Sequence, residues 1–511
     1  MSCEKRVFVP SELQKKFFHF VQHGQGNCNL IAVAGSGKST TCIRTLPLYP
    51  THLKVKMLSF GNRIVKDLKT KVTELEEEIG RKFPNVYVST FHSVAFSALR
   101  SYFKSKNMRG ELVENKLRNL LKTKISETEM FLYGKFVVDL VGYAKGSGIG
   151  IASIAANTDD NYYEIIEHHD MMLENKEAKL DRAVHIARAL LVASFKQCRD
   201  EGIYDFDDML YVPLALNLKF WQEDIIIVDE AQDMNRVRRE IVRQMMKCTT
   251  RVFFVGDPKQ AIFGFTGATN DAMEVIKAEF NCTDLMLNVS YRCPKAIVPK
   301  VQALVPYFEV YEGNRHGDEL NVDLKDMLEI VTERDAILCR NVAPMVSLAF
   351  KLIGKGRACH VLGSEIGKGI ITLIKRMGAE NIDHLKGLIE QWRDREMEAL
   401  LAKGKEDKAA GITDKAECVF ILIDNLSEAM RTIEGLIARI ESLFQDEERT
   451  LCLSSIHKAK GREWENVVIY CPERMPSPWA RKAWMQEQES NLEYVAYTRA
   501  MNVTMYLPEV V

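Results

Sequence analysis

Short apolar runs alternate with amphipathic helical patterns in two separate stretches of the chain. The runs of the first stretch are CNLIAVAG, LKVKMLSF, VYVST, DIIIVDE and RVFFVGD, and those of the second are AILCR, ACHVLG, LCLSSI, NVVIYC and VTMYL. Short, mostly apolar runs that alternate with helices are typical of parallel strands that helices cover on both faces. The pattern therefore predicts an α/β fold with two such cores.

Two segments interrupt this alternation with helical patterns alone. Residues 96–200 include ELVENKLRNLLKTKI and AKLDRAVHIARALLVASFKQC and contain no good strand candidate, and residues 380–447 include the charged run DREMEALLAKGKEDKAAGITDK. We interpret each segment as a helical insertion into the core around it, and for the second a solvated helical decoration without function remains an alternative. The predicted cores comprise residues 1–95 with 201–286, and 287–379 with 448–511.

Length, composition and cysteine usage narrow the class of protein. A chain of 511 residues, 46% of them hydrophobic, exceeds what one compact core normally holds. It shows no apolar run long enough to span a membrane and no apolar signal segment at its start, so we expect a soluble, intracellular protein with no membrane partner. The expected compartment is the cytoplasm, or the nucleus in a eukaryotic or viral host. The twelve scattered cysteines form no C-x-x-C pair, which indicates reduced, mostly buried thiols rather than metal ligands.

The charges nearly cancel, with 69 Lys and Arg against 70 Asp and Glu. Proteins that bind nucleic acid commonly carry an excess of positive charge, which this chain lacks as a whole. If the chain contacts DNA, the positive charge must therefore be concentrated in a local groove.

The run AVAGSGKST follows a predicted strand and precedes a helix, which is the context that a phosphate-binding loop requires. Gly35 and Gly37 allow backbone N–H groups to turn toward phosphate oxygens, Lys38 supplies a cation for the β and γ phosphates, and the Ser39 hydroxyl can bind Mg²⁺. The predicted cofactors are ATP and Mg²⁺. The residues predicted to contact the nucleotide from this loop are Ala34, Gly35, Ser36, Gly37, Lys38, Ser39 and Thr40.

The run DIIIVDEAQDMN ends a predicted strand with two carboxylates. We predict that Asp229 holds Mg²⁺ and that Glu230 orients and deprotonates the attacking water. Phosphoryl transfer also needs cations on the developing negative charge of the γ-phosphate. Arg292 in LNVSYRCP and Arg499 in YVAYTRA are the candidates.

These motifs and several others occur in an order that resembles the UvrD/Rep-type superfamily 1 helicases, and the resemblance spans nearly the whole chain. The further segments that carry it are VPSELQKKFF, KMLSFGNRIVKDL, VSTFHSVAF, YDFDDML, VGDPKQAIFGFTGA, SSIHKAKGREWENVVIY and NLEYVAYTRA. The resemblance implies two RecA-like P-loop NTPase cores, 1A and 2A, with ATP held between them. The helical insertions correspond to the family's 1B and 2B subdomains.

The resemblance also implies roles for individual residues around the nucleotide. Gln14 and Tyr291 contact adenine, Glu463 contacts the ribose, and Gln232 senses the nucleotide state. The residues implied to act on the γ-phosphate are Gln260, Arg292 and Arg499.

Single-stranded DNA is the implied partner, together with junctions between single and double strands; the resemblance does not indicate a loading partner. Phe265 is implied to stack on a base, although a core position is the alternative for an aromatic residue. The segment 380–447 is short for 2B, and Gly61 stands where relatives offer a hydroxyl group. The residues implied to contact DNA are Phe60, Asn62, Thr90, Phe91, His92, Phe265 and His457.

The function implied by the resemblance is that of an ATP-dependent 3′-to-5′ DNA helicase in repair, recombination or replication. A translocase that strips proteins from single strands without unwinding shares every motif and stays an alternative. An ATP-dependent regulatory or binding module is a third possibility, which the segments TFHS and GFTGA disfavour. RNA remains open as a substrate, because stacking and phosphate contacts tolerate either sugar.

Overall fold

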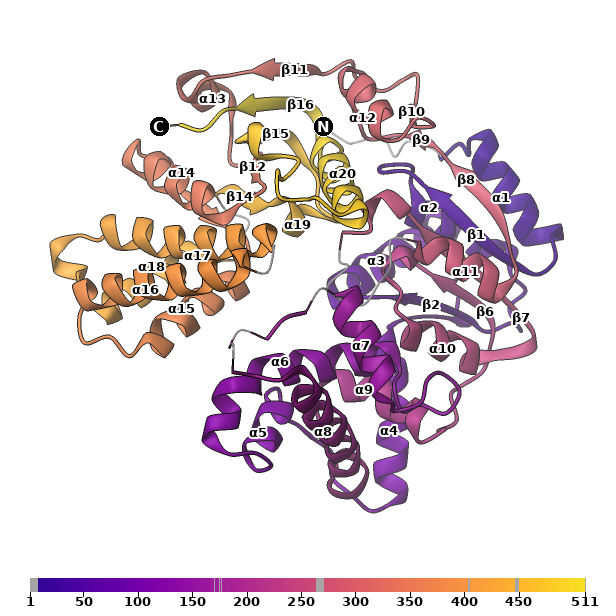
Figure 1. Ribbon diagram of the computed structural model, residues 1–511. Coiled ribbons are helices and arrows are strands. Elements are labelled where there is room, and N and C mark those ends of the chain that lie inside the picture. The colour runs from indigo at the N-terminus through magenta and orange to yellow at the C-terminus, as the bar shows by residue number, and fades with distance from the viewer. Residues whose placement is uncertain are drawn as a thin grey trace. The chain divides into compact units, whose positions relative to one another are not determined.

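The computed structural model describes residues 8–169, 171–173, 175, 177–262, 271–402, 405–445 and 450–510. The chain divides into two compact units. The first comprises Met1–Ala32 and Gly37–Leu287, and the second comprises Val33–Ser36 and Asn288–Val511. Each unit is built around a parallel β-sheet with helices against it (Figure 1).

The sheet of the first unit has six strands in the order β3-β2-β6-β7-β1-β8, all paired in parallel. Five of them coincide with the apolar runs of the first stretch, and the sixth, β8, is an edge strand that the sequence pattern did not indicate. The strands are β1 (Asn27–Ala32), β2 (Val55–Ser59), β3 (Val86–Thr90), β6 (Glu223–Val228), β7 (Met246–Gly256) and β8 (Cys282–Leu287).

Successive side chains of β7 illustrate why the runs are apolar throughout. Val252 and Phe254 belong to the hydrophobic core on one face of the sheet, whereas Phe253 and Val255 belong to the core on the other face. Because side chains of a strand alternate between the two faces, a strand buried on both faces must be apolar at every position. The two cores confirm the predicted arrangement of the sheet between layers of helices.

The helices of the first unit cover both faces of its sheet. Helices α5, α6 and α8 lie side by side in the segment between β3 and β6 (Figure 1). A two-residue strand β4 (Glu111–Leu112) pairs with β5 (Ile203–Tyr204), so this segment, expected to lack strands, contains a small one. The helices are α1 (Glu12–His23), α2 (Lys38–Arg44), α3 (Asn62–Ile79), α4 (Phe91–Ser105), α5 (Lys116–Lys122), α6 (Glu127–Ser147), α7 (Asp159–His168), α8 (Leu180–Glu201), α9 (Phe206–Ala215), α10 (Arg236–Met245) and α11 (Ala272–Phe280).

The sheet of the second unit also has six parallel strands, in the order β11-β16-β15-β12-β14-β13. The five predicted strands are present, and the short, exposed edge strand β11 is additional. The strands are β11 (Asp318–Asn321), β12 (Ala336–Cys339), β13 (Cys359–Val361), β14 (Leu451–Ser455), β15 (Trp464–Tyr470) and β16 (Ala500–Leu507).

Four helices, α15 to α18, form a group between β13 and β14 (Figure 1). This group begins at Ser364, earlier than the predicted insertion at residue 380. The helices of the unit are α12 (Val298–Leu304), α13 (Leu324–Ile330), α14 (Val342–Gly354), α15 (Ser364–Met377), α16 (Ile382–Leu401), α17 (Glu406–Asp424), α18 (Ile433–Leu443), α19 (Ile456–Ala459) and α20 (Ala483–Tyr497).

Two further features bear on the expectations from the sequence. The cysteines in the described part of the chain are free thiols, and most of them are buried, as predicted. Among the helices of the described residues, none combines the length and the apolar composition that a membrane crossing requires.

Candidate nucleotide and nucleic-acid sites

Functional segments follow the carboxyl ends of adjacent strands in the first unit. The phosphate loop follows β1, Asp229 and Glu230 follow β6, and Asp257 follows β7. Because these three strands are parallel neighbours, their carboxyl ends meet at one edge of the sheet. Open parallel sheets bind ligands at this edge.

The phosphate loop has the backbone conformation that its glycines were predicted to provide. Gly35 and Gly37 have φ angles of 73° and 78°, in the left-handed region where only glycine is free of steric cost. Gly37 is the N-cap of α2, so Lys38 is the first residue of that helix. The positive end of the helix dipole therefore points at the loop, as an anion site requires.

Ser39 and Asp229 form a pair of oxygen ligands. The Ser39 hydroxyl donates a hydrogen bond of 3.0 Å to the carboxylate of Asp229, whose other oxygen accepts the N–H of Glu230 at 3.1 Å. Asp229 is 3% exposed, and burial together with the neighbouring Glu230 raises the pKa of its carboxyl group. Oxygen ligands of this kind suit Mg²⁺, so the two residues fit the metal role predicted for them.

Lys38 and Glu230 form an ion pair at 3.4 Å. Burial opposes the charge on Lys38, but Glu230, Asp257 and Asp229 outweigh it and raise the pKa of the ammonium group. Glu230 has a φ of 55°, a left-handed conformation that is strained in a residue with a Cβ atom. The Glu230 carboxylate lies beside the lysine of the phosphate loop.

A chain of hydrogen bonds links Glu230 to the segment after β7. Gln232 donates to Glu230 at 2.5 Å and accepts the N–H of Asp257 at 3.1 Å. Asp257 in turn accepts a hydrogen bond of 2.7 Å from Gln260. The two glutamines with predicted roles are thus connected through Asp257, which the sequence analysis did not single out.

Gln14 lies on α1 with its side chain turned inward. It is 4% exposed, and its amide donates 2.9 Å to the hydroxyl of Thr41, which itself donates 2.9 Å to the carbonyl of Gly37. Its carbonyl accepts the N–H of Ser11 and closes a capping box. Gln14 is therefore attached to the phosphate-loop helix, while its predicted contact with adenine stays a prediction.

Residues predicted to contact DNA follow the two strands at the far side of the same edge. Phe60 and the exposed Asn62 come after β2. Thr90 caps α4 by accepting the N–H of Ser93 at 3.0 Å, and His92 lies in the first turn of that helix. We refer to this group, with Phe60, Asn62 and His92 as its partly exposed members, as the strand-side group.

Phe91 differs from the other members of this motif. It is 1% exposed and its ring lies 5.4 Å from that of Phe60. The ring of Phe91 thus belongs to the core, and the DNA contact predicted for Phe91 stays a prediction. In the structure it packs against Phe60.

Arg238, in the first turn of α10, lies over the ring of Phe60. Its guanidinium carbon is 4.9 Å from the ring centroid, a cation–π geometry. Burial is the main cause of the low pKa of His92, about 4, and Arg238 lowers it further. Arg238 belongs to the strand-side group by position, although no motif indicated it.

In the second unit, Arg292 and Glu463 are paired with each other. The guanidinium of Arg292 donates 2.8 Å to Glu463 and 2.9 Å to the carbonyl of Thr498. Arg499 is 1% exposed and donates to the carbonyls of Val495 and Arg462 at 2.9 and 3.1 Å. The predicted contacts of these residues with phosphate and ribose remain predictions.

The second unit also includes the apex of the phosphate loop, Val33–Ser36. The N–H of Ala34 donates 2.7 Å to the hydroxyl of Tyr494, and the carbonyl of Gly35 accepts 2.8 Å from the N–H of Tyr291. A Cβ atom on Gly35 would lie 2.6 Å from the hydroxyl of Ser290. Glycine is therefore required here by close packing as well as by its φ angle.

Two family models match the chain. Residues 13–281 match the model of the UvrD/REP helicase N-terminal domain, and residues 371–505 match that of the UvrD-like helicase C-terminal domain. The first match alone covers more than half of the chain. The chain belongs to the UvrD/Rep helicase family.

Several curated relatives carry helicase names. F-box DNA helicase 1 of Gallus gallus is 26% identical over 98% of this chain and 49% of its own length. A probable DNA helicase II homolog of Mycoplasma pneumoniae is 23% identical over 58% of this chain and 42% of its own, and the ATP-dependent DNA helicase Rep of Escherichia coli is 22% identical over 56% and 42%. The chain thus spans about half the length of the curated relatives that it matches, or less.

Two predicted DNA contacts of this UvrD/Rep family member have a different status. Phe265 lies outside the described residues. His457 lies in α19 of the second unit, and burial is the first cause of its low pKa, about 4, with Arg340 as a further cause. His457 is therefore neutral at neutral pH, and its predicted contact with DNA would not depend on positive charge.

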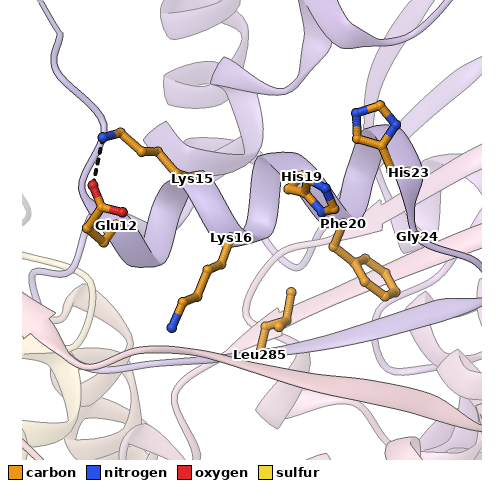
Figure 2. A pocket seen from close by; sticks show the side chains of 8 residues that line it. All are labelled: Glu12, Lys15, Lys16, His19, Phe20, His23, Gly24 and Leu285. Carbon is orange, nitrogen blue, oxygen red and sulfur yellow. Dashed lines mark hydrogen bonds and ion pairs between the residues drawn. The ribbon is translucent and has the colours of Figure 1, made fainter.

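One open hollow of the first unit lies next to the segment VPSELQKKFF, which contributes Glu12, Lys15 and Lys16 to its lining. It measures about 670 Å³ and runs along the exposed side of α1 (Figure 2). None of the predicted site residues lines it. Its lining residues are Glu12, Lys15, Lys16, His19, Phe20, His23, Gly24 and Leu285.

Asp257 and Arg238 are the residues that sequence reasoning missed. Asp257 had a detectable signal, because RVFFVGD ends an apolar strand with a carboxylate as DIIIVDE does. Arg238 had none, since one more arginine in the run NRVRREIVRQ looks like a solvated helix face.

Proposed function

We propose that this chain is an ATP-dependent DNA motor that moves 3′ to 5′ along single-stranded DNA and unwinds duplex. The observation that carries the proposal is the convergence of Lys38, Ser39, Asp229 and Glu230 at one edge of the first sheet. A lysine and a hydroxyl at a helix N-terminus, opposite two carboxylates, form the minimal set for hydrolysing a nucleoside triphosphate. Membership of the UvrD/Rep family supports DNA as the polymer on which the energy is spent.

Each residue of this set has a task in the proposed hydrolysis. Lys38 breaks its ion pair with Glu230 and binds the β and γ phosphates instead. Glu230, once released, accepts the proton of the attacking water. Ser39 and Asp229 would hold Mg²⁺, which would neutralise charge on the phosphates.

The hydrogen-bonded chain from Glu230 to Gln260 is suited to report on the nucleotide. Movement of Glu230 away from Lys38 changes the acceptor of Gln232, and Gln232 also holds the backbone N–H of Asp257. The segment that follows Gln260 includes Phe265, for which base stacking is predicted. We propose that this route carries the nucleotide state toward the strand.

The subdomain scheme is part of the proposal. Residues 1–95 with 201–286 would form 1A and residues 96–200 would form 1B. In the second unit the 2B boundary is better set at Ser364, where the group of helices α15 to α18 begins.

The pairing of Arg292 with Glu463 supports a role for this arginine in nucleotide binding, in which the phosphates of the nucleotide compete with Glu463 for its guanidinium.

The test is DNA-stimulated ATP hydrolysis combined with strand displacement from duplexes that carry a 3′ or a 5′ single-stranded tail. Stimulation by single-stranded DNA and displacement from the 3′-tailed duplex are expected. Displacement only from the 5′ tail would contradict the polarity. Stimulated hydrolysis that removes a protein block from a single strand, without displacement from either duplex, would identify the translocase that does not unwind.

Two further comparisons in the same assay test for a regulatory module and for an RNA motor. Hydrolysis that single-stranded DNA does not stimulate would favour a regulatory or binding module. Stimulation by single-stranded RNA that equals or exceeds stimulation by DNA would assign the motor to RNA instead.

A further inference from the structure

Arg238 is a cation that no anion of the described chain holds directly. It forms no side-chain hydrogen bond and no ion pair with the described residues, and its Nε is a buried donor without a partner there. Asp233 and Asp207 lie near enough to favour its charge, yet burial outweighs them and lowers the pKa of the guanidinium. Holding a half-buried arginine in this way costs free energy unless an anion completes its hydrogen bonds.

The fold brings this arginine to the strand-side group through three neighbouring strands. Phe60 follows β2, His92 follows β3, and Arg238 lies in the first turn of the helix that comes after β6. These strands are adjacent in the order β3-β2-β6, so the three side chains gather at one part of the sheet edge.

The side chains are also layered. Phe91 lies in the core, Phe60 packs on it at 5.4 Å, and the guanidinium of Arg238 packs on Phe60 at 4.9 Å. A guanidinium is planar and stacks on aromatic rings and on bases while its edges donate hydrogen bonds. An arginine held over a ring in this way has lost part of its freedom before any ligand arrives, which lowers the cost of binding.

We propose that Arg238 binds a backbone phosphate of the single strand, with its guanidinium plane held in place by the ring of Phe60. The proposal rests on the proposed function, since it names the chemistry by which the strand-side group holds DNA. Arg238 then supplies the positive charge of the strand-side group, while the ring of Phe60 holds its guanidinium in place.

A purely structural role for Arg238 makes a different prediction. If the arginine only positions Phe60, its removal weakens binding without changing the dependence on salt. A phosphate contact releases counterions, and for single strands each such contact contributes about 0.7 to the slope of log K against log salt. The salt slope therefore separates the two roles.

The experiment measures binding of a fluorescent oligo-dT by fluorescence anisotropy between about 50 and 200 mM salt, for the wild type, Arg238→Gln and Arg238→Lys. Arg238→Gln should weaken binding roughly tenfold, as expected for a hydrogen bond to a charged group, and should reduce the slope by about 0.7. Arg238→Lys keeps the charge but loses the plane and the fork, so it should keep the slope while losing part of the affinity.

Arg236→Gln is the matched control. Arg236 is exposed, lies two residues earlier on the same helix, and donates to the carbonyl of Ile154 at 2.9 Å. Its removal should leave both the slope and the affinity unchanged. Melting temperatures of all variants, measured on the same preparations, identify any variant that fails to fold.

The outcomes are distinguishable. A folded Arg238→Gln variant with the slope of the wild type would overturn the phosphate contact while leaving the proposed function intact, and so would a loss of slope in Arg238→Lys as large as in Arg238→Gln. A wild type that does not bind oligo-dT at any salt concentration would instead contradict the proposed function.

Discussion

The two parts of the carboxyl edge of the first sheet are prepared for their ligands in opposite ways. At β6, β7 and β1, the nucleotide side, the polar groups bond to one another, as in Lys38 with Glu230 and Ser39 with Asp229. At β3 and β2, the strand side, Phe60 and His92 are partly exposed, and Arg238 forms no ion pair within the described residues.

On the proposed function, the difference leads to a separate expectation for each ligand. A nucleotide can enter only by replacing bonds that the protein already makes, so its arrival changes the protein and can be sensed. On the proposed function, a strand would meet rings and a cation that need no rearrangement, so we expect it to slide past without a large change at each step. β6 serves both parts, because Glu230 follows it directly and Arg238 lies eight residues further on.

The largest effect is expected from Glu230→Gln, which removes the proposed base and one internal partner of Lys38 together. Hydrolysis should fall by about 10² to 10⁴, the usual contribution of a general base. Nucleotide affinity should not fall, because Lys38 no longer has to leave a carboxylate. Single-turnover hydrolysis and binding of a fluorescent nucleotide measure the two quantities.

Glu223→Gln is the control for Glu230→Gln. Glu223 is a buried carboxylate at the opposite end of the same strand, where it lies 3.9 Å from Lys56. Its substitution should leave hydrolysis near the wild-type rate. Normal hydrolysis by Glu230→Gln would place the base elsewhere.

Lys38→Ala tests whether the nucleotide side depends on one cation. Three carboxylates, Glu230, Asp257 and Asp229, support the charge of Lys38. Without it, DNA-stimulated hydrolysis should fall by about 10² to 10³, as when one preorganised electrostatic group is removed. Binding of oligo-dT without nucleotide should be unchanged, since the strand side has its own cation.

The exposed Lys15, which is paired only with Glu12 in the described structure, provides the matched Lys15→Ala control. Equal losses of hydrolysis in both lysine variants would show that the effect is not local to the phosphate loop. Loss of oligo-dT binding in Lys38→Ala would break the separation between the two sides.

The same contrast explains how much the sequence predicted. Ten strands were visible as short, mostly apolar runs, because most of them are buried on both faces, whereas β8 and β11 lie at sheet edges, carry exposed polar residues and give no such run. Residues of the nucleotide side lie in contiguous motifs that one loop or strand end delivers. Arg238 gains its role only from Phe60, which is distant in the sequence, so no local pattern could reveal it.

A buried ionic network lies next to the strand-side group, so we expect it to affect both the stability of the fold and the strand side. Lys145 is 1% exposed and is paired with Asp205 and Asp208 at 2.7 Å each, and Asp208 is also paired with Lys116 at 2.5 Å. Burial opposes the charge of Lys145, but Asp208 and Asp205 outweigh it and raise its pKa. Asp205 and Asp208 lie at the start of α9, which packs on α4, the helix of His92.

Lys145→Met should lower the free energy of unfolding by about 3 to 5 kcal/mol, the usual cost of leaving a buried partner unpaired. Urea denaturation measures this change in free energy. On heating of the Lys145→Met variant, binding of oligo-dT should be lost at a lower temperature than binding of nucleotide. The double variant Lys145→Met/Asp205→Asn should recover part of the loss, because Asn can still accept the N–H of Asp208 and cap α9. A double variant less stable than the single one would contradict this account.

The smallest effect concerns pH, where the two sides have opposite signs. Burial raises the pKa of Asp229, so the folded state binds its proton more readily than the unfolded state does. The stability contributed by Asp229 is therefore lost as pH rises above about 4, the ordinary value for Asp. Burial, with Arg238 as the second cause, lowers the pKa of His92 to about 4.

For His92 the unfolded state binds the proton more readily, so stability is lost as pH falls from about 6.5 to about 4. The two contributions offset each other in the wild type, and single variants separate them. Between pH values of about 7 and 4, the stability of His92→Gln relative to the wild type should increase as pH falls, by about 1 to 3 kcal/mol. Asp229→Asn should show the opposite trend, since it removes a group whose protonation stabilises the folded state.

Arg238→Gln should raise the pKa of His92 by less than burial lowers it, which NMR titration of the imidazole can measure. Parallel trends in His92→Gln and Asp229→Asn would show that the two sides do not differ in charge preference, and an unchanged His92 pKa in Arg238→Gln would separate the arginine from the histidine.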